Sequence, residues 1–211
     1  QQGTNIALIT DAGTPGISDP GEDLVRICYE QGIEVTSLPG AAACITALTL
    51  SGLPTRRFSF EAFLPKEKKE RAAVLEELKN DTRTLIVYEA PHHLLGTLKE
   101  LQNVLGDRRL TVCRELTKKF ETAFQTTFSE AIRYYEEQGV RGECVLVIEG
   151  RSREELVQEA QQSWEAISVE EHMEHYLSTG MDRKSAMKQV AKDRGVGKRE
   201  IYQMLLNAEN Q

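Results

Sequence analysis

Residues 5–21, NIALITDAGTPGISDPG, decide the fold class of this chain. The first six form an apolar run of strand length, and Asp11 then opens a loop rich in glycine and proline. An amphipathic stretch, residues 22–31, follows the loop and stops at Gly32, which predicts a helix. A buried strand that leads through such a loop into a helix is typical of a parallel α/β sheet.

The same pattern is repeated once before residue 54. Residues 34–38 predict a second strand, and the small residues 41–51 predict a helix that Gly52 terminates. Two strands do not form a stable sheet alone, so we expect the other strands of this layer upstream of Gln1 or on another chain. Residues 1–54 are therefore interpreted as the remainder of an N-terminal α/β domain.

A second α/β domain is expected over residues 55–151. Its predicted strands alternate with predicted helices, as in other α/β layers. The strands are expected at 57–63, 84–88, 110–115 and 143–149, and the helices at 66–80, 94–105 and 129–138.

Residues 152–211 are highly charged and predict a small helical appendage. Helices are expected at 164–179 and 182–207. Within the second of these, Ala191, Gly195 and Ile201 stand at the spacing of a helix-turn-helix, in which a small residue, a turn glycine and a buried aliphatic residue recur.

The composition limits the classes of function. The chain has 211 residues, of which 40% are apolar, enough for a buried core. No apolar run approaches the roughly 18 residues of a membrane span, so no membrane partner is expected. The four cysteines are scattered without a C-x-x-C motif, which favours a reducing compartment, the cytoplasm, and no metal site.

The distribution of charge indicates a nucleic-acid partner more strongly than the net charge of −7 opposes one. Residues 183–199 contain seven basic residues and a single acid, whereas residues 154–174 are acidic. The basic face is either a solvated helix surface or a contact with phosphates, and the segregation of basic from acidic residues favours the contact. The candidates are Lys184, Lys188, Lys192, Lys198 and Arg199, with a second cluster at Lys66, Lys68 and Lys69.

The loop of residues 11–21 is a candidate ligand site. Glycines at 13, 16 and 21 allow the backbone to approach a ligand closely, at the strand end where open α/β sheets bind ligands. No Gly-Lys-Ser/Thr follows, and the glycine spacing is not G-x-G-x-x-G. The loop therefore predicts a site without naming its ligand.

Five motifs in order resemble a known family. ALITDAGTPGISDPG, SLPGAAACITALTLSGLP, TLIVYEAPHHL, CRELTKKFE and GECVLVIEG are similar to the motif set of tetrapyrrole methylases. DAGTPGISDPG together with FLPKEKKER and YEAPHHL resembles the branch of ribosomal RNA cytidine 2′-O-methyltransferases. The resemblance covers residues 3–150 and implies two α/β domains, the first incomplete here, that hold S-adenosylmethionine in a cleft, plus the helical appendage.

The resemblance also implies site residues and partners. The activity that the resemblance implies is 2′-O-methylation of a cytidine ribose in 16S ribosomal RNA of the small subunit. Members of the family often form homodimers, so a homodimer is expected by analogy. Family members carry a further N-terminal segment that closes the cleft, so this chain alone is expected to bind the cofactor weakly or to be inactive. The cofactor residues it implies are Asp11, Ala12, Gly13, Gly16, Ile17, Ala42, Ala43, Glu89 and Leu116.

Transfer of a methyl group to a hydroxyl requires a base, and three carboxylates at strand ends are candidates: Asp11, Glu89 and Glu115. Lys118 would balance charge or hold a phosphate. Two alternatives remain open. One is a methylase of a porphyrin or corrin precursor, whose loop reads like GGDPFIFGRGG, and the other is a non-catalytic nucleic-acid-binding fragment.

Overall fold

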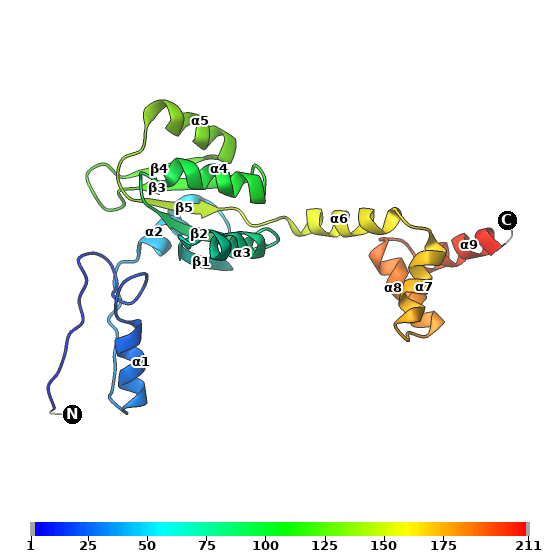
Figure 1. Cartoon of the computed structure of the whole chain (residues 1–211), viewed down its shortest axis with the longest axis horizontal. Helices are drawn as coiled ribbons and strands as arrows, with labels where there is room; N and C mark the ends of the chain where they lie inside the picture. The colour runs from blue at the N-terminus through cyan, green and yellow to red at the C-terminus, as the bar shows by residue number, and fades with distance from the viewer. Residues whose placement is uncertain (1–2, 210–211) are drawn as a thin grey trace. The chain divides into compact units, whose positions relative to one another are not determined.

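The computed structural model describes residues 3–209, with side chains described for residues 3–207. The chain divides into two compact units between Arg151 and Ser152, and each is described by itself (Figure 1).

The first unit is built on a mixed five-stranded sheet. Its strand order is β1-β2-β5-β3-β4. The β1–β2 pair is parallel, and the other three pairs are antiparallel. The strands are β1 (Phe58–Phe63), β2 (Thr84–Glu89), β3 (Arg109–Arg114), β4 (Thr122–Thr127) and β5 (Cys144–Ile148).

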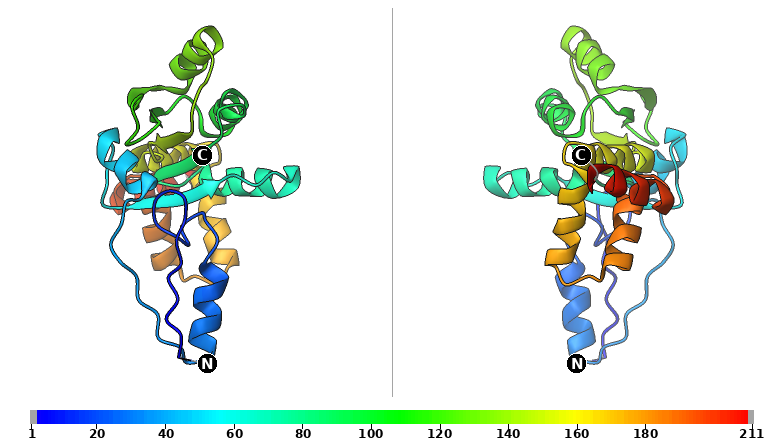
Figure 2. Two further views of the ribbon diagram at one scale, coloured as in Figure 1. Left: turned by 90° about the vertical axis from the view of Figure 1, so that its left-hand side faces the viewer. Right: turned by 90° about the vertical axis from the view of Figure 1, so that its right-hand side faces the viewer.

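Helices cover both faces of this sheet (Figures 1 and 2). Alternate side chains of a strand point to opposite faces, so Leu85 and Val87 pack in one core and Ile86 in the other. The larger core lies under α3 (Lys68–Leu78), α4 (Leu94–Leu105) and α5 (Phe128–Gln138). The smaller core lies under α2 (Ala43–Ser51) alone.

The α/β class and most elements of this unit are confirmed. β1, β2, β3 and β5 and the three helices of the larger core lie where the sequence predicts them, within two residues at each end. The edge strand β4 was not predicted, because its sequence TAFQTT has a single large apolar residue, Phe124. It pairs with β3 along the whole strand.

The two strands predicted before residue 54 are wrong. Helix α1 (Glu22–Glu30) forms as expected, but residues 5–10 and 34–38 are not strands. Ile6, Ile9 and Leu38 are 80%, 83% and 82% exposed. A strand needs a neighbour for its backbone N–H and C=O groups, and the described part of the chain places none beside these segments.

The second unit contains four helices within the described residues. Three of them enclose one apolar core, which includes Met173, Val190 and Ile201. The helices are α6 (Arg153–Glu165), α7 (Val169–Ser178), α8 (Arg183–Asp193) and α9 (Lys198–Glu209). None of the helices formed by residues 3–209 is long and apolar enough to span a membrane.

The predicted helices 164–179 and 182–207 are each divided in the structure. Ser168 starts α7 with a capping box, because its hydroxyl accepts from the N–H of Glu171 and the Glu171 carboxylate accepts from the N–H of Ser168. Gly195 has a φ of 66° in the turn between α8 and α9. Ala191 and Ile201 are buried on either side of that turn, which is the helix-turn-helix arrangement that their spacing predicts.

Candidate functional site

The carboxyl ends of β2 and β3 meet at one edge of the sheet. β5 runs antiparallel between these strands, and its first residue, Cys144, pairs with both Glu89 and Arg114. Glu115 follows Arg114 directly, and its backbone N–H donates to the carbonyl of Glu143. Two of the three predicted acid–base candidates, Glu89 and Glu115, therefore flank the start of β5.

Glu89 is buried, and both of its carboxylate oxygens accept hydrogen bonds from the protein. Oε1 accepts from the N–H of Ala90 at 2.9 Å, and Oε2 accepts from the Thr97 hydroxyl at 2.5 Å. Arg71 donates to the same hydroxyl at 2.9 Å and forms an ion pair with Glu100 at 2.6 Å. This network fixes the Glu89 side chain between the sheet, α3 and α4.

Glu115 begins a turn with unusual backbone angles. Glu115 and Thr117 have φ values of 48° and 64°, a region that costs energy for residues other than glycine and that occurs often at functional sites. Glu115 Oε1 accepts from the N–H of Glu143 at 3.1 Å and from Lys118 at 3.3 Å. Hydrogen bonds from Lys118 to Glu143 and Glu115 raise the pKa of the Lys118 ammonium above its ordinary value.

The first turn of α2 is held by a tyrosine from β2. The N-cap residue, Ala42, has no side chain that can cap the helix, and the Tyr88 hydroxyl accepts from the N–H of Cys44 at 3.0 Å. The Tyr88 ring packs edge-on against Phe60 and Phe63. Burial first, and then Cys44, raise the pKa of Tyr88 to about 12, so its hydroxyl stays protonated at neutral pH.

Two predicted cofactor residues pack against the same core as this tyrosine. Ala42 and Leu116, which are 74 positions apart, are both half-buried at the rim of the α2 core, together with Tyr88 and Phe60. Sequence reasoning missed the two aromatic residues, although a Phe and a Tyr on neighbouring predicted strands were a usable signal.

The glycine-rich loop lies against the segment that precedes α2. The Thr14 hydroxyl donates to the carbonyl of Ala41 at 2.9 Å. A Cβ at Gly13 would stand 3.4 Å from that carbonyl oxygen, and one at Gly40 would stand 3.1 Å from the Thr14 hydroxyl. The two segments thus approach through their backbones, and the glycines permit the approach. Asp11, by contrast, is exposed and accepts a hydrogen bond only from Thr10 among the described residues.

Apart from Lys118, the predicted RNA-binding residues form two exposed clusters, one in each unit. Lys66, Lys68 and Lys69 lie at the start of α3, where the backbone N–H groups of Lys69 and Glu70 lower the pKa of Glu67. The other cluster is Lys184, Lys188 and Lys192 on α8 with Lys198 and Arg199 on α9, and no described carboxylate forms an ion pair with any member of either cluster.

Nothing in the described part of the chain resembles a metal centre, since no three His, Cys, Asp or Glu side chains there are close enough to share an ion. His172 is fully buried, and its Nδ1 accepts from Nε of Arg194 at 3.1 Å. That bond occupies the lone pair that a metal would need.

Comparison with known proteins gives one consistent result. The family model for tetrapyrrole (corrin/porphyrin) methylases matches residues 1–132. "Ribosomal RNA small subunit methyltransferase I" of Halalkalibacterium halodurans is 47% identical over 95% of this chain and 69% of its own length. The protein of the same name from Bacillus subtilis is 48% identical over 96% of this chain and 69% of its own length. Among solved structures, the methyltransferase CobJ superposes with a TM-score of 0.50 at 20% identity, covering 64% of this chain and 61% of that one, and shares the fold.

Proposed function

This chain belongs to the tetrapyrrole (corrin/porphyrin) methylase family, and we propose that it methylates the 2′-hydroxyl of a cytidine ribose in 16S ribosomal RNA with S-adenosylmethionine as the methyl donor. One observation carries the proposal. The identity to the small-subunit methyltransferases covers 95% of the chain, whereas the family model ends at residue 132. The similarity therefore includes the helical unit with its basic face. An enzyme acting on a small porphyrin or corrin substrate would not need such a surface.

The cofactor is proposed to bind where the glycine-rich loop, the start of α2 and the turn after β3 supply backbone and small side chains. This surface fits a ligand that is held by backbone groups, because Gly13, Gly40 and Ala42 leave it without bulky side chains. When bound there, S-adenosylmethionine supplies a methyl group on a sulfonium, which is activated for in-line displacement. The proposed contacts are Asp11, Ala12, Gly13, Gly16, Ile17, Ala42, Ala43, Glu89 and Leu116.

We propose different roles for the three carboxylates, according to the hydrogen bonds that each one accepts. Asp11 and Glu115 keep a carboxylate oxygen that accepts no hydrogen bond from described residues, so either is able to take the proton of the ribose hydroxyl. Glu89 has both oxygens occupied, by Ala90 and Thr97. We assign Glu89 to positioning, since it fixes the end of β2 next to Tyr88.

Contacts with RNA phosphates are proposed for the two exposed basic clusters and for Lys118. Each lysine that touches a phosphate releases a counterion, which makes binding depend on salt. Lys118 would exchange one of its two carboxylate partners for a phosphate.

The test is transfer of a tritiated methyl group to small ribosomal subunits from a strain that lacks the activity. The expected result is incorporation into the RNA at one cytidine, in a form that resists alkaline cleavage because its 2′-hydroxyl is blocked. Incorporation into a base, or into a porphyrin precursor and not into RNA, would refute the proposal. If the chain binds RNA and incorporates no methyl group, while calorimetry detects no cofactor binding, the non-catalytic alternative is correct.

A further inference from the structure

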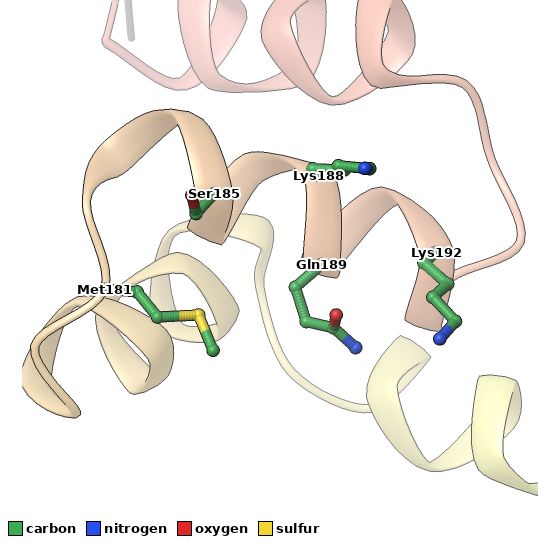
Figure 3. Close-up of a pocket in the computed structure, with 5 residues that line it drawn as sticks. All are labelled: Met181, Ser185, Lys188, Gln189 and Lys192. Carbon is green, nitrogen blue, oxygen red and sulfur yellow. The ribbon is translucent and has the colours of Figure 1, made fainter.

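A pocket of about 450 Å³ opens beside α8 in the second unit (Figure 3). This volume lies within the range of small-ligand sites, roughly 300–1,000 Å³. Four of its five lining residues belong to one face of α8, at helical spacings of three and four. The proposed function uses only Lys188 and Lys192 of these residues, as contacts with RNA phosphates. The lining residues are Met181, Ser185, Lys188, Gln189 and Lys192.

The amide of Gln189 is fixed in orientation by a chain of hydrogen bonds. Its Nε2 donates to Asp193 Oδ1 at 2.8 Å, and Asp193 Oδ2 accepts from the Tyr176 hydroxyl at 2.6 Å. Because the amide nitrogen is held in this way, Oε1 is left as an oriented acceptor that no described donor occupies. Figure 3 shows this carboxamide between Met181 and Lys192.

The other lining groups complement that acceptor. Lys188 and Lys192 both line the pocket, are exposed and form no ion pair with a described carboxylate, so two cations border the pocket. Met181 is 40% exposed and offers a polarizable thioether, which packs well against aromatic rings. Two cations, one fixed acceptor and one soft apolar side chain together match the phosphate, the edge and the face of a nucleotide.

We propose that this pocket binds one unpaired nucleotide of the RNA substrate. Lys188 and Lys192 hold its phosphate, Met181 packs against its base, and Gln189 Oε1 accepts a hydrogen bond from its exocyclic amine. The proposal rests on the proposed action on RNA. Cytosine carries a donor amine where uracil carries an acceptor oxygen, so the pocket prefers cytidine to uridine.

The test compares short fluorescein-labelled oligocytidylate and oligouridylate by anisotropy with the full chain over a salt series. The parent is expected to bind oligocytidylate about three- to tenfold more tightly, as one net hydrogen bond allows. Gln189→Ala is expected to equalise the two affinities and to leave their salt dependence unchanged. Gln203→Ala, which removes an exposed amide on α9 outside the pocket, is the matched control and keeps the preference.

The lysines provide a second pair of variants. Lys188→Gln is expected to reduce the slope of log affinity against log salt by about 0.7, the value for one contact with a single strand, and to reduce the cytidine preference. Lys184→Gln, one turn away and outside the pocket, lowers both affinities equally and keeps their ratio. An unchanged urea midpoint shows that each variant is folded.

The outcomes separate this inference from the proposed function. If the parent methylates small subunits but binds both oligonucleotides equally or not at all, the pocket inference is wrong. It is also wrong if Gln189→Ala retains the preference. If the parent does not methylate ribosomal RNA, the proposed function is wrong, whatever the oligonucleotides show.

Discussion

Acid is expected to destabilise the second unit through His172. This imidazole is fully buried, and burial lowers its pKa below the ordinary 6.5, with Arg194 adding repulsion and the Asp193 carboxylate at 3.5 Å opposing it. Above pH 6.5 both the folded and the unfolded states hold a neutral imidazole. Below pH 6.5 the unfolded chain binds a proton that the folded unit does not, so the free energy of unfolding falls as the pH falls.

The size of the effect follows from linkage. A single proton changes the free energy of unfolding by at most about 1.4 kcal/mol per pH unit. Between pH 7.5 and 5.5, the loss in the free energy of unfolding is at most about 1.4 kcal/mol, the limit reached if the buried imidazole stays neutral throughout. Hydrogen bonds from Ser185 hold the pKa of Asp182 below 3.8, so this carboxylate titrates outside the window.

The assay uses the only tryptophan of the chain. Trp164 stacks on His172 with ring centroids 3.9 Å apart and planes 6° apart, so its fluorescence in a urea titration reports this unit. His172→Gln is expected to abolish the change between pH 7.5 and 5.5. His175→Gln is the matched control, because His175 is exposed and lies 5.4 Å from the same ring. A flat profile in the parent, or an undiminished one in His172→Gln, would refute the reasoning.

Three further predictions concern the first unit. Gly13→Val forces a branched side chain into a backbone with φ of 75° near the carbonyl of Ala41. Calorimetry should then detect no cofactor binding, while the urea midpoint of the sheet is unchanged. Unaltered cofactor affinity would remove the loop from the site. Leu98→Ala leaves a cavity in the larger core and should lower the free energy of unfolding by about 2–5 kcal/mol, measured by circular dichroism in urea. Thr97→Val removes the donor to buried Glu89 and should cost about 1–3 kcal/mol in the same assay, and a neutral result would show that the network is dispensable.

The strands that are buried on both faces were predicted correctly from the sequence. The errors lie where the presence or absence of a neighbouring strand determines whether a segment forms a strand. β2 and β5 are continuous apolar runs, and a strand inside a sheet is the only short element that such runs suit here. Residues 5–10 have the same pattern but no neighbouring strand among the described residues, so they form no strand, and residues 5–9 are exposed. β4 shows the converse, because its partner β3 makes a strand of a polar sequence.

The candidate site was predictable to the extent that it depends on strand ends. Strand boundaries placed Glu89 and Glu115 at one sheet edge, because parallel strands end together. The buried carboxylate of Glu89 is bound by Thr97 of α4, which in turn is bound by Arg71 of α3, and no local pattern shows that these helices converge. The role of Glu89 as a proton acceptor was therefore the part of the site prediction that the sequence alone supported least.

The basic residues illustrate the same division. The sequence predicted Lys118 as a residue able to hold a phosphate. In the structure Glu143, 25 positions away in sequence, forms an ion pair with Lys118, and this contact depends on the tertiary fold. Lys184, Lys188 and Lys192 recur every fourth residue on one helix, so their common face follows from helix geometry alone. A pattern of charged residues predicts a contact surface when the geometry of a single helix determines which residues surround each charge. For this reason α8, and not the turn after β3, is the place where loss of a lysine should change RNA binding without disturbing an internal ion pair.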